Sequence, residues 1–104
     1  MKNVTNQEWK DLTAQDDNKV ILDVRTPEEV AEGIIPGAIN IDIFLGAGFV
    51  EQVQQLDQDK TYYVYCRAGS RSAQACGVME SLGFNKTTNL SGGFSNWDGE
   101  VGTL

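Results

Sequence analysis

The sequence has no histidine and only two cysteines, Cys66 and Cys76. Without histidine, a Cys–His catalytic pair is excluded, so a nucleophilic cysteine would have to be activated by the residues of its own loop. Two thiols without a Cys-x-x-Cys spacing argue against both a disulfide scaffold and a zinc site. We therefore expect a protein that uses neither a metal nor another cofactor.

Long apolar runs and basic residues are also scarce. No apolar stretch approaches the length needed to span a membrane, and residues 1–5 show no apolar signal region. The chain has 8 basic and 15 acidic residues, which give a formal net charge of −7. This acidic excess opposes binding to nucleic acid or to an anionic membrane. We expect a cytoplasmic, monomeric protein with a single domain spanning residues 1–104.

The most informative stretch is an apolar, aromatic run over residues 62–65 that ends at Cys66. A loop with two arginines and a glycine follows, and then a helix-forming segment over residues 72–82. This order of strand, loop and helix directs the loop amides and a helix N-terminus at one point, where negative charge is favoured. Gly69 can adopt a positive φ, which would help these amides to curl into an anion-binding nest.

Charge and hydrogen bonding in this loop predict a reactive cysteine. Arg67 and Arg71 add positive charge beside Cys66, so we expect the pKa of its thiol to be depressed. Cys66 is then a nucleophile whose incoming or leaving group is an anion. The alternative is a buried structural cysteine, which two neighbouring charges make unfavourable.

The third arginine, Arg25, follows another predicted strand and has two interpretations. It forms a salt bridge inside the fold, with Asp23 as a candidate partner, or it adds to a local positive spot near Cys66. The sequence favours neither of these roles over the other.

Strand-like and helix-like segments alternate along the chain, which predicts an α/β sandwich with a mainly parallel central sheet of about five strands flanked by helices. The expected strands are residues 20–24, 38–41, 62–65 and 87–90, with a short edge strand ending at Val4. The expected helices are residues 6–14, 26–33, 49–56 and 72–82. Residues 44–48, which include two glycines, are expected to form a loop.

Capping signals and apolar spacing refine this prediction. Thr5 with Glu8 and Thr26 with Glu29 have the spacing of capping boxes at two helix starts. The helix at residues 72–82 has an apolar stripe that is typical of a core face, and its Cys76 is expected in the core rather than as a resolving thiol for Cys66.

A glycine-rich segment at residues 91–97 precedes the end of the chain. Its glycines invite comparison with a phosphate-binding loop, but it contains neither Gly-Lys-Ser nor Gly-x-Gly-x-x-Gly. We expect a tight turn that docks Phe94 and Trp97 into the core and brings backbone near the Cys66 loop.

Four segments in this order resemble a known family. They are Leu22-Asp23-Val24-Arg25-Thr26-Pro27-Glu28-Glu29, Ile35-Pro36-Gly37-Ala38-Ile39-Asn40-Ile41, Cys66-Arg67-Ala68-Gly69-Ser70-Arg71-Ser72-Ala73, and Gly92-Gly93-Phe94-x-x-Trp97. Together they extend over nearly the whole chain. The chain resembles a single-domain rhodanese, or thiosulfate sulfurtransferase-like domain, which implies a rhodanese-like three-layer sandwich.

The resemblance implies sulfur transfer through a persulfide on Cys66, the catalytic residue. The donor would be thiosulfate or a persulfide, and the acceptor would be cyanide, a small thiol or a protein thiol. Asp23 and Arg25 would be supporting residues. The residues expected to bind the substrate are those of the loop and the helix start: Arg67, Ala68, Gly69, Ser70, Arg71 and Ser72.

One position departs from the family pattern. The family usually has Gly-His-Ile-Pro-Gly-Ala where this chain has Ile34 in place of the histidine. We interpret the family's histidine as a structural hydrogen-bonding residue, so its replacement leaves the implied activity in place.

Three alternative functions are compatible with this kind of fold. Phosphatases and arsenate reductases of related fold have a longer loop, whereas only four residues separate Cys66 from Arg71 here, which suits a sulfur atom better than a phosphate. A non-catalytic binding module is disfavoured because Cys66 and both arginines are present. A persulfide carrier or sensor would use the same cysteine.

Overall fold

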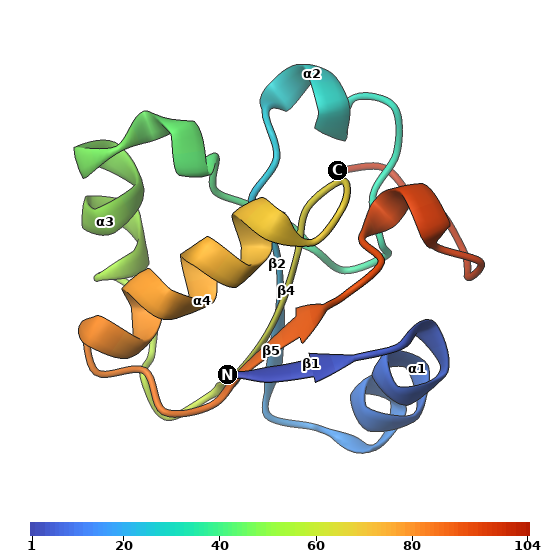
Figure 1. The fold of residues 1–104 in the computed structure, drawn as a ribbon, viewed down its shortest axis with the longest axis horizontal. Helices are drawn as coiled ribbons and strands as arrows, with labels where there is room; N and C mark the ends of the chain where they lie inside the picture. The colour runs from blue at the N-terminus through green and yellow to red at the C-terminus, as the bar shows by residue number, and fades with distance from the viewer.

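A parallel β-sheet lies between two groups of helices in the computed structural model, which describes all residues from Met1 to Leu104 (Figure 1). The sheet has five strands in the order β1-β5-β4-β2-β3, and every neighbouring pair is parallel. The strands are β1 (Lys2–Val4), β2 (Lys19–Asp23), β3 (Ile39–Asn40), β4 (Thr61–Tyr65) and β5 (Thr87–Leu90). The predicted α/β sandwich with a mainly parallel sheet is confirmed, as is the edge strand that ends at Val4.

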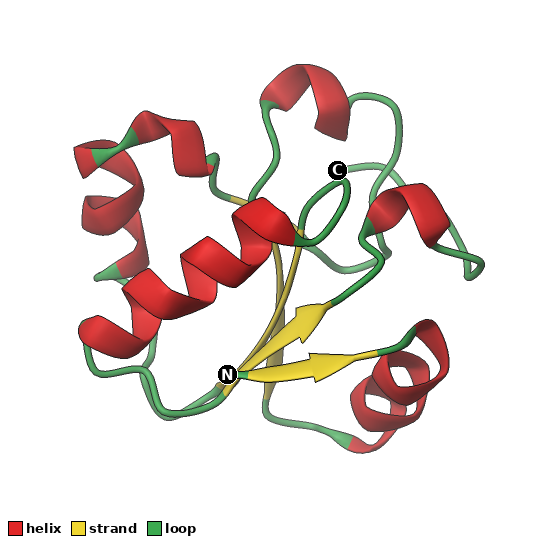
Figure 2. Cartoon of the chain, viewed as in Figure 1, coloured by secondary structure: helices red, strands yellow, loops and turns green.

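Helices cover both faces of the sheet, as the red and yellow segments of Figure 2 show. The helices are α1 (Asn6–Gln15), α2 (Pro27–Val30), α3 (Ala47–Val53) and α4 (Ser70–Ser81), with 3-10 turns η1 (Ile43–Leu45) and η2 (Phe94–Asn96). Helices α3 and α4 lie on one face, and α1 lies on the other (Figure 1). No helix is both long and apolar enough to cross a bilayer.

Both capping boxes are present. The Thr5 side chain accepts from the Glu8 amide while the Glu8 carboxylate accepts from the Thr5 amide, and Thr26 and Glu29 make the same reciprocal pair at α2. Each N-cap of this kind stabilises a helix start by about 1 kcal/mol. Helix α2 has only four residues, so the cap contributes much of the stability of this short helix.

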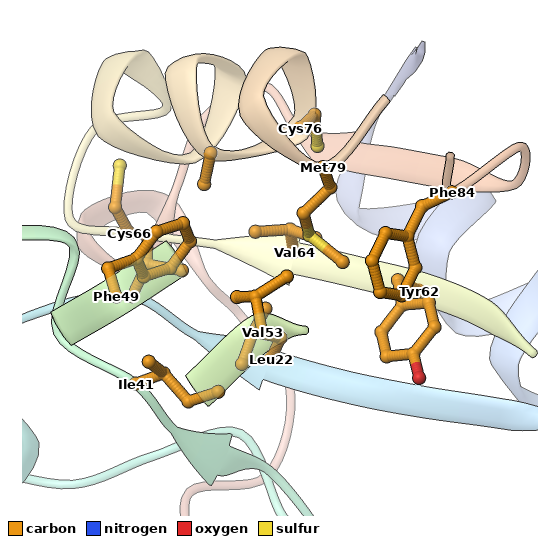
Figure 3. Close-up of a cluster of buried hydrophobic side chains, with 12 residues drawn as sticks. Leu22, Ile41, Phe49, Val53, Tyr62, Val64, Cys66, Cys76, Met79 and Phe84 are labelled. Atoms are coloured by element: carbon orange, nitrogen blue, oxygen red, sulfur yellow. The ribbon is translucent and has the colours of Figure 1, made fainter. Parts of the chain in front are cut away.

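The central strand β4 supplies the core on both sides of the sheet, because successive side chains of a strand point to opposite faces. Tyr62 and Val64 pack with α3 and α4, as Figure 3 shows, whereas Tyr63 and Tyr65 pack with α1. On the α1 side, Trp9 meets the Tyr63 ring edge-on at a centroid distance of 5.6 Å. The same strand that anchors both halves of the core therefore leads directly into Cys66.

Two predicted boundaries are wrong in an informative way. Residues 44–48 are not a loop, since η1 is followed by α3, which begins at Ala47 after Gly46 at φ 58°. A glycine inside a helix costs up to about 1 kcal/mol, but Phe49 and Val53 bury one face of α3 and offset that cost. The helix also ends at Val53, three residues earlier than expected.

Helix α4 begins at Ser70, two residues before the predicted start at Ser72. The cause is Gly69, which takes the N-cap position with φ 101°, a conformation that strongly favours glycine. The chain therefore turns into the helix immediately after three loop residues, and Arg71 and Ser72 belong to its first turn.

Candidate active site

Cys66 follows β4 directly and lies at the carboxyl end of the sheet. It is only 1% exposed, and its carbonyl accepts a hydrogen bond from the Phe94 amide at 2.8 Å. The next carbonyl, that of Arg67, accepts from the Ser95 amide at 3.0 Å. These two bonds tie the cysteine loop to the segment after β5, which confirms the expected approach of that segment to the loop.

The sulfur of Cys66 is surrounded by hydrogen-bond donors from its own loop and the start of α4. The Gly69 amide lies 3.1 Å from Sγ, and the Ser72 hydroxyl lies 3.4 Å from it. Burial acts to raise the pKa of this thiol, but the hydroxyl and amide of Ser72 and the amides of Gly69 and Ala68 lower it overall. The expected depression of the pKa is confirmed, and hydrogen bonds from the loop and helix start produce it without a histidine.

Replacing Ser72 with alanine is expected to raise the pKa of the Cys66 thiol, because the hydroxyl bond that favours the thiolate is lost. The thiolate fraction at pH 7 should fall by about three- to tenfold, which corresponds to the roughly 1 kcal/mol of one long hydrogen bond. The ultraviolet absorbance of the thiolate, followed against pH, measures this directly. Ser70→Ala is the matched control because Ser70 is exposed in the same helical turn, and an equal shift in both variants would contradict the assigned role.

Two glycines allow the walls of the site to approach each other. A Cβ atom on Gly69 would lie 2.3 Å from the Ser91 carbonyl oxygen, and one on Gly93 would lie 2.3 Å from the Arg67 carbonyl oxygen. Behind the loop, the Asn89 amide group donates to the Gly69 carbonyl at 3.2 Å. The glycine-rich segment is thus a tight turn against the cysteine loop, as expected, and Asn89 is a supporting residue that the sequence did not indicate.

Both arginines beside Cys66 are paired with a single carboxylate, that of Glu29. Arg71 binds it with two parallel contacts, Nη1–Oε1 at 2.7 Å and Nη2–Oε2 at 2.8 Å, and Arg67 Nε reaches Oε2 at 2.9 Å. Hydrogen bonds from Arg71 are the main reason that the pKa of Glu29 lies far below its usual range. The expected positive spot at the loop is therefore partly neutralised.

The Asp23–Arg25 pair is buried beneath the site, with side-chain exposures of 0% and 2%. Arg25 Nε and Nη2 contact the two carboxylate oxygens at 2.7–3.1 Å, and Nη2 also donates to the Gly33 carbonyl at 2.7 Å. The guanidinium lies 4.4 Å from the Phe94 ring centroid. Of the two interpretations of Arg25, the internal salt bridge is confirmed, and this residue adds no exposed positive charge near Cys66.

The two remaining positions of interest are core residues. Ile34, which replaces the family's histidine, is 2% exposed and pairs through its backbone with Gly102. Cys76 is fully buried, and burial raises the pKa of its thiol to about 12. Figure 3 shows Cys66 and Cys76 apart in the same core cluster, so Cys76 offers little thiolate for a resolving reaction.

No surface cavity opens over Cys66. The three cavities have volumes of about 310–480 Å³, and no residue of the cysteine loop lines any of them. The groups available for recognition at the sulfur are the loop amides, the Ser72 hydroxyl and the arginines.

Comparison with known proteins agrees with this geometry. The rhodanese-like domain model matches residues 5–100. The chain belongs to the rhodanese-like domain family.

The curated relatives and solved structures extend over nearly the whole rhodanese-like domain. A putative sulfurtransferase of Bacillus subtilis, YtwF, is 38% identical over 101 residues, which cover 97% of this chain and 94% of the relative. A sulfurtransferase of Allochromatium vinosum is 33% identical over 81% of this chain and 76% of its own length. A rhodanese-like domain protein from Staphylococcus aureus superposes with a TM-score of 0.85 at 30% identity, covering 100% of this chain and 99% of that one.

Proposed function

We propose that this protein is a sulfurtransferase that carries a sulfane sulfur as a persulfide on Cys66. The observation that carries the proposal is the position of Cys66 Sγ against the Gly69 amide and the Ser72 hydroxyl, at 3.1 and 3.4 Å, in a chain with no histidine. The family membership and the relatives named sulfurtransferases support the reaction class.

The proposed first half-reaction loads the cysteine. The Cys66 thiolate attacks the outer sulfur of thiosulfate, so that an S–S bond forms on Sγ while the S–S bond of thiosulfate breaks. Sulfite leaves with the bonding electron pair, and the persulfide anion stays on the protein. The amides of Gly69 and Ser72 face the sulfur and stabilise this negative charge.

The proposed second half-reaction returns the free thiolate. Cyanide, a small thiolate or a protein cysteine attacks the outer sulfur, and the Cys66 thiolate leaves with the electron pair of the persulfide bond. Neither half-reaction needs an oxidant, a metal or a proton transfer by histidine. The short loop supports a cargo of one sulfur atom rather than a phosphoryl group.

A persulfide carrier that hands its sulfur only to a protein thiol is the second candidate. A putative sulfur carrier protein of Bacillus subtilis that is 33% identical over 89% of this chain supports it. Such a protein would load normally from a donor but would turn over slowly with small acceptors.

Turnover with thiosulfate and cyanide tests the proposal, with thiocyanate and sulfite measured together. We expect equal amounts of both products and parallel double-reciprocal plots, the pattern of a reaction through a covalent intermediate. Loading without turnover would support the carrier. No persulfide from thiosulfate or from a small-molecule persulfide would contradict both candidates.

A further inference from the structure

The Glu29 carboxylate binds both arginines beside Cys66, the cations that would attract an anionic sulfur donor. Its two carboxylate oxygens bind Arg71 through both terminal nitrogens and Arg67 through Nε, at 2.7–2.9 Å. Glu32 Oε1 also lies 3.9 Å from Arg67 Nη2, so the cluster of two arginines and two carboxylates has a net charge of about 0, which would be about +1 without Glu29. The side chains of Glu29 and Arg71 are only 15% and 20% exposed, so water screens this pair less than an ordinary surface pair.

The capping box holds Glu29 in this place. Its Oε1 accepts from the Thr26 amide at 3.2 Å and from the Thr26 hydroxyl at 3.1 Å. An incoming anion would have to share the arginines with a carboxylate that is anchored from a second element. Glu29 therefore lowers the attraction of the site for a donor in proportion to the donor's negative charge.

We infer that Glu29 is a specificity-determining residue that weakens the advantage of dianionic sulfur donors over donors with a single negative charge at the transferable group. The inference rests on the proposed function and deepens it by naming the donor class. Thiosulfate, a dianion, then loses attraction to the arginines because of Glu29, whereas a persulfide or a thiosulfonate anion loses about half as much.

A matched pair of small donors separates charge from shape. Methanethiosulfonate has the tetrahedral sulfur and terminal sulfur of thiosulfate, but a methyl group replaces one oxygen, so it carries one negative charge. The Cys66 thiolate attacks its terminal sulfur, the S–S bond breaks, and methanesulfinate leaves with the electron pair. Both donors would leave the same persulfide on the protein, so kcat/KM for loading can be compared directly.

Glu29→Gln removes the charge and keeps the shape. Glutamine also closes a capping box, so the Thr26 contacts and the Arg71 Nη1 contact remain available on Oε1, whereas the amide nitrogen in place of Oε2 accepts from neither arginine. We expect kcat/KM for thiosulfate to rise about fivefold, mainly through KM, and that for methanethiosulfonate about twofold, because a unit charge acts twice as strongly on a dianion. The difference between the two donors in their rise of kcat/KM on Glu29→Gln should shrink at high salt.

Glu28→Gln is the control for net charge, since Glu28 is exposed on the same helix and the substitution changes the net charge equally. It should leave the ratio of the two donors unchanged. A ratio that stays at the wild-type value in Glu29→Gln, with persulfide formed from both donors, would overturn the inference and leave the proposed function standing. No persulfide on wild-type protein from either donor would overturn the proposed function itself.

Arg67→Gln provides a variant that keeps the capping bonds of α2, because Arg67 contacts Oε2 of Glu29 whereas Thr26 binds Oε1. The Arg67 side chain is 51% exposed, so its replacement should not affect folding. The cluster loses one positive charge, and we expect the thiosulfate to methanethiosulfonate ratio to fall about threefold. An unchanged ratio here would show that the charge of this cluster does not act on the donor, which would also overturn the inference.

Discussion

Cys66→Ser is expected to abolish sulfur transfer while leaving the fold intact. A serine hydroxyl occupies nearly the same space and can accept the bond from the Gly69 amide, so packing around the position changes little. It cannot form a persulfide, and without a histidine no nearby base could activate it. We expect thiocyanate formation from thiosulfate and cyanide to fall by at least about 10³-fold, as for loss of an essential nucleophile.

Cys76→Ala is the control for this prediction. It removes the only other thiol, which is fully buried, and should retain most of the turnover of the folded protein. Turnover near the wild-type value in Cys66→Ser would show that Cys66 is not the sulfur carrier. Loss of turnover in Cys76→Ala, with an unchanged circular dichroism spectrum, would instead give Cys76 a role in transfer.

Asp23→Asn is expected to produce the largest loss of stability among single polar substitutions. Asp23 and Arg25 are buried with exposures of 0% and 2%, and removing one partner leaves the other charge buried without compensation. Such a loss costs about 3–5 kcal/mol, which is a large part of the 5–15 kcal/mol that stabilises a typical domain. The guanidinium would not escape the penalty by losing its proton, because arginine stays protonated in proteins.

Chemical denaturation of three variants measures this effect. Asp17→Asn is the matched control, because Asp17 is exposed and its free energy of unfolding should stay within about 0.5 kcal/mol of wild type. The double variant Asp23→Leu with Arg25→Met should recover part of the loss, since no buried charge remains. A loss below about 1 kcal/mol in Asp23→Asn would contradict the view that this pair is desolvated.

Local signals account for the parts of the fold that the sequence predicted well. Thr5 with Glu8 and Thr26 with Glu29 act over three residues, and the apolar runs that became β2 and β4 stand out without knowledge of their neighbours. The cysteine loop was also identified, because Cys66 and Gly69 lie within one strand–loop–helix unit. Their neighbours in sequence are largely their neighbours in space.

The features that were missed depend on contacts between distant segments. The spacing of Glu29 explained it fully as a capping residue, yet the same carboxylate binds Arg71, which lies 42 positions away. Asn89 supports Gly69 from β5, 20 positions away. Neither contact leaves a periodic or compositional pattern in the sequence. The prediction from sequence therefore overestimated the positive charge at the loop and did not include the support that Asn89 gives to Gly69.

Helix α3 shows a different limit, because its glycines suggested a loop. Gly46 is at the N-cap and Gly48 lies inside the helix. The burial of Phe49 stabilises this helix enough to outweigh the low helix propensity of glycine. Tertiary packing often overrides propensity of this size.

The intact mass of the pure protein, before and after incubation with thiosulfate, tests the central claim most directly. The account predicts a gain of one sulfur atom on wild type and on Cys76→Ala, none on Cys66→Ser, and reversal by cyanide. Fragmentation should place the added sulfur on the peptide that contains Cys66. A gain on Cys66→Ser, or no gain on wild type from thiosulfate or from a small-molecule persulfide, would contradict it.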